Sequence, residues 1–267
     1  MPTLSTPNGP LHYEVIDHVA PWRARRPTVL FHHGIGASAQ IWAGWLPRLI
    51  DRYRVVTWEM RGYGRSQPSA GFKWSLQALM ADIFAIADAA EAERFHLVGE
   101  SIGGTIALAA ALARSDRIET LTISNGAHLG TSIQNVAKWR EQLGQGMKAW
   151  SDKFMHDRFH DGALSVRRWA WFASQQEKWT PESVLDALGV LVGTDLTPQL
   201  GNLRIPVLLL HPDGSPFIPV PMAAELQRLL PNARLRVFEH ARHGLPFSHA
   251  DECAAALRAF LDSRPGD

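Results

Sequence analysis

The chain has 267 residues, of which 46% are hydrophobic and 20% charged, and its 27 Lys and Arg nearly balance its 26 Asp and Glu. This composition is typical of a globular protein, and a formal charge of +1 without a basic run argues against a nucleic-acid binder. The single cysteine, Cys253, excludes an internal disulfide and a cysteine-based zinc site. No stretch is apolar enough to predict a membrane span, so we expect a cytoplasmic protein with no membrane or nucleic-acid partner.

Short apolar runs alternate along the chain with longer helical patterns, which is typical of an α/β protein. The predicted strands are Leu11–Ile16, Thr28–His32, Arg54–Trp58, Phe95–Val98, Thr120–Ser124, Val207–His211 and Leu235–Phe238. The predicted helices are Trp74–Ala89, Ile102–Ala113, Met222–Leu230 and Glu252–Leu261. Three of these strands, which begin at Thr28, Phe95 and Val207, are almost wholly apolar, as expected of central parallel strands covered on both faces.

The alternation stops between Leu129 and Thr197, where no strand-like run occurs and helical polar patterns dominate. Five of the ten tryptophans of the chain lie in this segment: Trp139, Trp150, Trp169, Trp171 and Trp179. Tryptophans mostly serve packing, although one or two can line a pocket. We therefore predict a helical insertion at 129–197 in a core made of residues 1–128 and 198–267.

The most informative stretch is Gly99-Glu100-Ser101-Ile102-Gly103, a Gly-x-Ser-x-Gly motif between a predicted strand and a predicted helix. Such a turn is so tight that Cβ atoms at the two glycines would clash, and it holds the serine in strained backbone geometry with its hydroxyl exposed. Because Ile102 opens the helix, its N–H points toward a reacting carbonyl group. The motif therefore predicts that Ser101 is a nucleophile.

A second glycine-rich stretch, His33-Gly34-Ile35-Gly36, follows the predicted strand that ends at His32. Its glycines permit close approach of the backbone to a substrate, and the N–H of Ile35 is the expected second donor of an oxyanion hole beside that of Ile102. A plain glycine-rich turn is the alternative interpretation.

A serine hydroxyl needs a base to act as a nucleophile at neutral pH. His243 lies in a loop between the last predicted strand and the final helix, where doubly wound sheets place functional loops. His240 and His249 flank it, but His243 is the expected base. The adjacent His32 and His33 point to opposite sides of a strand without spaced carboxylate or thiolate partners, so we expect no metal site and no cofactor.

These motifs, in their order and spacing, resemble the α/β-hydrolase fold family over nearly the whole chain. The resemblance is carried by Gly99–Gly104, His33–Gly36, Arg61–Ser66 and Arg242–Gly244. Within the family the chain is most similar to 3-oxoadipate enol-lactonases, on the stretches His33–Ser38, Ile123–Thr131, Gly146–Met147 and Asp195–Leu196. The resemblance implies a mostly parallel sheet flanked by helices, with residues 129–197 as a helical cap.

The chain departs from the family where the acid of a catalytic triad is expected. In the loop that follows the strand predicted at Val207–His211, the family has an Asp four residues before a Pro. Counting back four residues from Pro219 gives Ser215 in this chain. Three interpretations remain open. Asp213 can serve as the acid from a reshaped loop; Asn125, at the end of the preceding strand, can hydrogen-bond a ring nitrogen without neutralising an imidazolium; or the triad is incomplete. Glu100 is a second departure, because the family commonly has a neutral residue or His there.

The resemblance implies hydrolysis of a small-molecule ester or lactone, with an enol-lactone of aromatic catabolism as the first substrate to test. In this mechanism Ser101 attacks the carbonyl, His243 accepts and returns the proton, Asp213 orients His243, and the N–H groups of Ile35 and Ile102 hold the oxyanion.

Two residues where the insertion begins, Lys138 and Trp139, are the expected substrate contacts, with Lys138 or Arg140 paired to a substrate carboxylate. A carbon–carbon bond hydrolase of ring-cleavage products and a non-catalytic ligand-binding protein are the alternative functions. A serine nucleophile disfavours haloalkane dehalogenases and epoxide hydrolases, which need a carboxylate. The sequence leaves the oligomeric state open.

Overall fold

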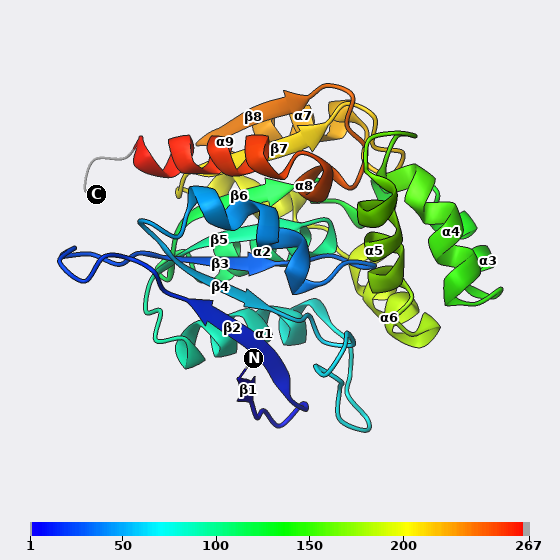
Figure 1. Ribbon diagram of the computed structural model, residues 1–267, viewed down its shortest axis with the longest axis horizontal. Helices are drawn as coiled ribbons and strands as arrows, with labels where there is room; N and C mark the ends of the chain where they lie inside the picture. Colours follow the sequence, from blue (N-terminus) through cyan, green and yellow to red (C-terminus); the bar gives the residue numbers. More distant parts are fainter. Residues whose placement is uncertain (1, 264–267) are drawn as a thin grey trace.

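A computed structural model of the protein describes residues 2–263 and contains one eight-stranded sheet (Figure 1). The outer limits of the expected core, residues 1 and 267, lie outside the described residues. The strands are β1 (Thr3–Leu4), β2 (Leu11–Ile16), β3 (Thr28–His32), β4 (Arg54–Trp58), β5 (Phe95–Glu100), β6 (Ile118–Ser124), β7 (Val207–Pro212) and β8 (Ala233–Phe238). Their order across the sheet is β1-β2-β4-β3-β5-β6-β7-β8.

The sheet is antiparallel only at one edge, where β2 pairs with β1 and with β4, and every other pairing is parallel. All residues of β3, β5 and β7 are buried, as their apolar sequences predict. The carboxyl ends of the parallel strands therefore meet at one edge, and residues 32–35, 99–101 and 211–215 are brought together there.

Helices cover both faces of the sheet. One face packs against α1 (Leu76–Ala89), α2 (Ile102–Ala113) and α7 (Val220–Leu229), and the other against the 3-10 helix η1 (Ala39–Arg48) and α9 (Ala250–Asp262). Successive residues of β3 alternate between the two cores, with Leu30 in the first and Phe31 in the second. A short helix, α8 (Leu245–Ser248), precedes α9.

The predicted strands and core helices are confirmed to within a few residues at their ends, and the predicted fold class is confirmed with them. β1, η1 and the short α8 were not predicted from the sequence. The second omission has a physical reason, since η1 contains Gly44 and Pro47, which disfavour a regular helix, and its stability comes from packing of the fully buried Trp42 and Trp45.

Between β6 and β7 the chain forms four helices that lie together beside the carboxyl ends of the strands (Figure 1). These inserted helices are α3 (Val136–Leu143), α4 (Met147–Arg158), α5 (Val166–Gln176) and α6 (Pro181–Val192), with short 3-10 turns at Gly130–Ser132 and Thr197–Asn202. The segment enters and leaves at one point, because Leu129 bridges Asp195 and the N–H of Gly130 donates to Thr194 O. None of the helices within residues 2–263 is long and apolar enough to cross a membrane.

Candidate active site

The turn between β5 and α2 holds Ser101 in a strained conformation, with φ 55° and ψ −124°. A Cβ atom on Gly99 would lie 2.4 Å from Gly103 O, and one on Gly103 would lie 2.6 Å from His32 O. Both positions therefore require glycine, as the motif predicts. A positive φ at a serine is costly and persists only where the surrounding structure enforces it. The turn presents the Ser101 hydroxyl at the carboxyl edge of the sheet.

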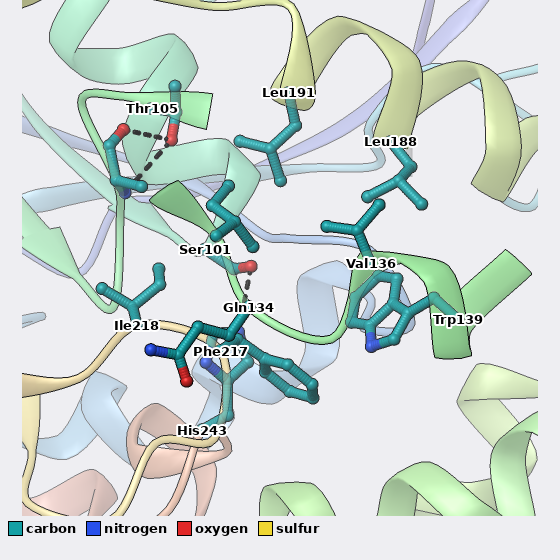
Figure 2. Close-up of a pocket in the computed structure, with 12 residues that line it drawn as sticks. Ser101, Thr105, Gln134, Val136, Trp139, Leu188, Leu191, Phe217, Ile218 and His243 are labelled. Carbon is teal, nitrogen blue, oxygen red and sulfur yellow. Dashed lines mark hydrogen bonds between the residues drawn. The ribbon is translucent and has the colours of Figure 1, made fainter. Parts of the chain in front are cut away.

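His243 lies directly beside this hydroxyl, with Nε2 at 3.1 Å from Ser101 Oγ (Figure 2). The imidazole is 2% exposed and packs edge-on against the ring of Phe217, 4.8 Å between centroids. Its backbone is held from two sides, because Asn125 Nδ2 donates to His243 O at 2.6 Å and the N–H of Gly244 donates to Arg158 O at 2.9 Å. The structure thus brings the two residues into the arrangement of a nucleophile and its base.

The expected acid is not at the imidazole. Ser215 Oγ lies 3.1 Å from Nδ1 of His243, whereas the exposed Asp213 accepts hydrogen bonds from the N–H groups of His240 at 2.9 Å and Ala241 at 3.0 Å. The expectation that Asp213 orients His243 is therefore wrong. Its carboxylate fixes the backbone of the loop before His243 and does not contact the ring.

Asn125, the alternative considered for the acid, contacts the carbonyl of His243 and not its ring. Ser215 Oγ is also approached by the N–H groups of Phe217 at 3.4 Å and Ile218 at 3.3 Å. Within residues 2–263, no carboxylate is hydrogen-bonded to the imidazole. The ring therefore has hydroxyl partners at both nitrogens.

This environment keeps His243 neutral. Burial lowers its pKa well below 6.5, and the positive charge of Arg158 and the neighbouring His211 act in the same direction. A neutral imidazole can accept a proton at neutral and mildly acidic pH. The imidazolium that forms after proton transfer is not stabilised by a negative charge, and a hydroxyl, which both donates and accepts, does not select one tautomer of the ring.

The two expected oxyanion donors belong to segments that touch at Ser101. Ile102 is the first residue of α2, and the first N–H groups of a helix have no acceptor within it. Ile35 lies in the loop after β3, where a Cβ on Gly34 would lie 2.8 Å from Ser101 Cβ. Both N–H groups thus belong to backbone that borders Ser101.

Glu100 is buried and does not face solvent. Its Oε2 accepts a hydrogen bond from the N–H of Gly34 at 2.7 Å, and its Oε1 lies 3.9 Å from Nη1 of Arg158, the last residue of α4. Burial raises the pKa of Glu100, against the opposing effects of Arg158 and the Gly34 N–H. Arg158 could not be singled out from the sequence, because no local pattern distinguishes a buried arginine from the exposed arginines of helix ends.

A largely apolar pocket lies over Ser101 and His243 (Figure 2). It is lined by Ser101, Thr105, Ala127, Ile133, Gln134, Val136, Trp139, Leu188, Leu191, Phe217, Ile218 and His243. Of the two expected substrate contacts, Trp139 lines the pocket and Lys138 does not; Lys138 and Arg140 are both exposed. Apart from His243, the lining contains no group that is charged near neutral pH.

Comparison with known proteins agrees with this geometry. Residues 27–250 match the family model described as alpha/beta hydrolase fold. The protein belongs to the α/β-hydrolase fold family. The family predicted from the motifs is thereby confirmed, and the match covers most of the core, the inserted helices, Ser101 and His243.

Among relatives, the protein is 28% identical to the "Putative carbamate hydrolase RutD" of Caulobacter sp. (strain K31), over 94% of this chain and 95% of that protein. It is 26% identical to a pimeloyl-[acyl-carrier protein] methyl ester esterase of Aeromonas hydrophila, over 88% of this chain and 95% of that one. Among solved structures, an enol-lactonase from Burkholderia xenovorans LB400 superposes with a TM-score of 0.86 at 20% identity, covering 98% of this chain and all of the other (100%). At that identity the likeness concerns the fold.

Proposed function

We propose that this protein is a serine hydrolase of small, uncharged carboxylic esters, lactones included. The observation that carries the proposal is the 3.1 Å contact between Ser101 Oγ and Nε2 of His243 at the base of an apolar pocket. The relatives support the same class of chemistry, because their names describe hydrolysis at a carbamate and at a methyl ester.

In the proposed reaction, Ser101 attacks the substrate carbonyl while Nε2 of His243 takes its proton. The N–H groups of Ile35 and Ile102 hold the oxyanion of the tetrahedral intermediate. His243 returns the proton to the leaving oxygen, and water then hydrolyses the acyl-enzyme with His243 again as the base. Ser215 holds the ring through Nδ1 during both steps.

The lining of the pocket favours an uncharged substrate. Transfer of a carboxylate into an apolar environment is costly unless a cation or several donors compensate it, and the lining residues include no cation. Lys138, the expected partner of a substrate carboxylate, is exposed and does not line the pocket. We therefore propose an uncharged acyl group as the preferred occupant, in place of the anionic enol-lactone that the sequence suggested.

We further propose that the inserted helices act as a cap that selects the substrate. Trp139 and Val136 of α3 and Leu188 and Leu191 of α6 form the apolar wall opposite Ser101 (Figure 2). The length of acyl group that is accepted is then set by these four side chains.

The test is hydrolysis of p-nitrophenyl acetate, butyrate, octanoate and hemisuccinate by the wild type and Ser101→Ala, at matched concentrations of folded protein. We expect turnover of the acetate and butyrate that is lost in Ser101→Ala, weaker turnover of the octanoate, and at least tenfold lower kcat/KM for the anionic hemisuccinate. A fluorophosphonate probe should label Ser101, as located by mass spectrometry. If wild type and Ser101→Ala behave alike in both assays, the site is not hydrolytic and a ligand-binding role replaces this proposal.

A further inference from the structure

Glu100 and Arg158 are a buried pair of opposite charges that the hydrolytic mechanism does not use directly. Their side chains are 2% and 1% exposed, and their nearest charged atoms are 3.9 Å apart. Taking two such charges out of water costs several kcal/mol per ion, and a buried ion pair is weak evidence of a contribution to stability. We therefore expect the pair to have a role other than stability, in the backbone groups that the two side chains contact.

Each of them binds the loop that carries Ile35. Glu100 Oε2 accepts the N–H of Gly34 at 2.7 Å, and Arg158 Nη2 donates to the carbonyl oxygen of Ile35 at 2.5 Å. The peptide group between these two is held as well, because its carbonyl oxygen, that of Gly34, lies 2.9 Å from Nδ1 of His33. Three consecutive peptide groups, 33–34, 34–35 and 35–36, are thus each held by one side chain.

The middle peptide group is the one that contains the N–H of Ile35. Gly34 O also accepts the N–H of Ala37 at 3.2 Å. In a planar trans peptide the N–H points opposite to the C=O, so these two contacts of Gly34 O direct the Ile35 N–H to the other side. Glu100 and Arg158 hold the two flanking peptide groups and so fix the Cα positions of Gly34 and Ile35, between which the middle group lies. The pair therefore fixes where the Ile35 N–H lies relative to Ser101.

Arg158 also connects this loop to two other parts of the site. Its Nε donates to Gln176 Oε1 at 2.7 Å, which fixes the guanidinium within the inserted helices. Its carbonyl accepts the N–H of Gly244, the neighbour of His243, at 2.9 Å. The end of α4 thus contacts the oxyanion loop through its side chain and the histidine loop through its backbone.

We propose that Glu100 and Arg158 are positioning residues that fix the Ile35 N–H as an oxyanion donor and make its geometry depend on the docking of α4. The inference rests on the proposed hydrolase function. It adds that the unusual acidic residue of the Gly-x-Ser-x-Gly turn acts on the oxyanion hole, and not on the substrate or on His243.

The experiment compares wild type, Glu100→Gln, Arg158→Lys and Arg158→Met with a p-nitrophenyl ester that the wild type hydrolyses. The readouts are kcat, KM and the inhibition constant of a trifluoromethyl ketone of the same acyl group, which forms an oxyanion on Ser101. Loss of an oxyanion donor costs about 10²–10³ in kcat, so we expect a fall of at least about tenfold in Glu100→Gln and Arg158→Met. KM should change less than threefold, the ketone should bind more weakly in proportion to kcat/KM, and Arg158→Lys should retain part of the activity.

A second buried ion pair, Arg61–Asp82, serves as the matched control, because its charged atoms are 2.7 Å apart and it lies outside the site. Asp82→Asn should lower the melting temperature while leaving kcat and ketone binding unchanged. If Glu100→Gln, or Arg158→Met where Glu100→Gln does not fold, keeps wild-type kcat and ketone affinity, the pair is only structural and the inference is overturned. Absence of Ser101-dependent turnover in the wild type would instead overturn the proposed function, so the two failures are distinct.

Discussion

Ser215 meets His243 through a hydroxyl, with Oγ at 3.1 Å from Nδ1, at the position where a catalytic imidazole usually has a carboxylate partner. A carboxylate accepts only, so it fixes the tautomer with the proton on Nδ1 and stabilises the imidazolium. A hydroxyl does neither. The geometry of the nucleophile and base is complete, while the electrostatic support of the base is missing.

Ser215→Asp should therefore increase activity. The N–H groups of Phe217 and Ile218, which approach Ser215 Oγ at 3.4 and 3.3 Å, are placed to bind the new carboxylate. Removal of the corresponding acid from another hydrolase costs about 10⁴ in kcat, so a gain of at least about tenfold is expected for Ser215→Asp. The isosteric control is Ser215→Asn, which should show no gain. Equal or lower kcat in a folded Ser215→Asp enzyme would contradict this account.

Asp213→Asn should leave kcat within about threefold of wild type, because Asp213 binds the N–H groups of His240 and Ala241 and not the imidazole. Although slight burial opposes the effect, these N–H groups lower the pKa of the Asp213 carboxyl. The carboxylate is exposed, so after allowance for solvent screening its loss should cost about 1 kcal/mol or less of unfolding free energy.

The matched control is Glu239→Gln, which removes an exposed carboxylate from the loop that precedes His243 and should change neither kcat nor the free energy of unfolding. Steady-state kinetics measures kcat, and urea unfolding measures the free energy of unfolding. A loss of 10³ or more in kcat for Asp213→Asn alone would return the role of the acid to Asp213.

The pH dependence of kcat/KM should reflect the lowered pKa of His243. Burial, Arg158 and His211 disfavour the imidazolium, so the base remains neutral as the pH falls below 6.5. Activity should hold a plateau from pH 8 to below pH 6, and the acid limb should move to higher pH in Ser215→Asp, where a carboxylate stabilises the charged ring. An inflection at or above pH 6.5 in the wild type would show that the imidazolium is not disfavoured in the free enzyme.

The lowered pKa of His243 also makes the stability of the protein depend on pH. Because the native pKa of His243 is below its unfolded value, the unfolded chain binds a proton there that the native protein does not. This group therefore reduces stability progressively as the pH falls below about 6.5, down to its native pKa, and has no effect above about 6.5. Urea unfolding of wild type and His243→Gln between pH 5 and 8 should show a smaller acid loss in the variant. If the free energy of unfolding of the two proteins changed with pH in parallel, the predicted effect of His243 on stability would be contradicted.

Trp139→Ala should both enlarge the pocket and destabilise the inserted helices. The indole is 6% exposed and contacts the rings of Phe154 and Phe217 at centroid distances of 4.7 and 5.2 Å. Truncation of a buried Trp to Ala costs about 3–5 kcal/mol, and the vacated volume lies beside the substrate. We expect the preference among p-nitrophenyl esters to move from butyrate toward octanoate. The control Trp22→Ala removes an indole that is 85% exposed, and it should change neither stability nor chain-length preference.

The parts of the site that could be predicted from the sequence are those determined by local structure. Gly99, Ser101, Gly103 and Ile102 lie within one strand–turn–helix unit, and the requirement for glycine in such a tight turn does not depend on the rest of the chain. The strands were predictable because those buried on both faces are apolar along their whole length. His243 was predictable because the order of elements places its loop at the carboxyl edge of the sheet.

The orientation and burial of side chains in the site depend on contacts between distant segments. Asp213 and Ser215 are two residues apart in one loop, and the N–H groups of His240 and Ala241 turn the carboxylate outward and leave Ser215 at the ring. Trp139 rather than Lys138 lines the pocket because the packing of α3 fixes which side of that helix faces inward.

The pairing of Glu100 with Arg158 joins the end of a central strand to the end of an inserted helix. The sequence alone was enough to predict the residues of the proposed chemistry: a serine nucleophile, a histidine base and two backbone donors. The side chains that would support this chemistry were found only in the folded chain, because contacts between distant segments depend on the packing of the whole chain and leave no periodic pattern in the sequence.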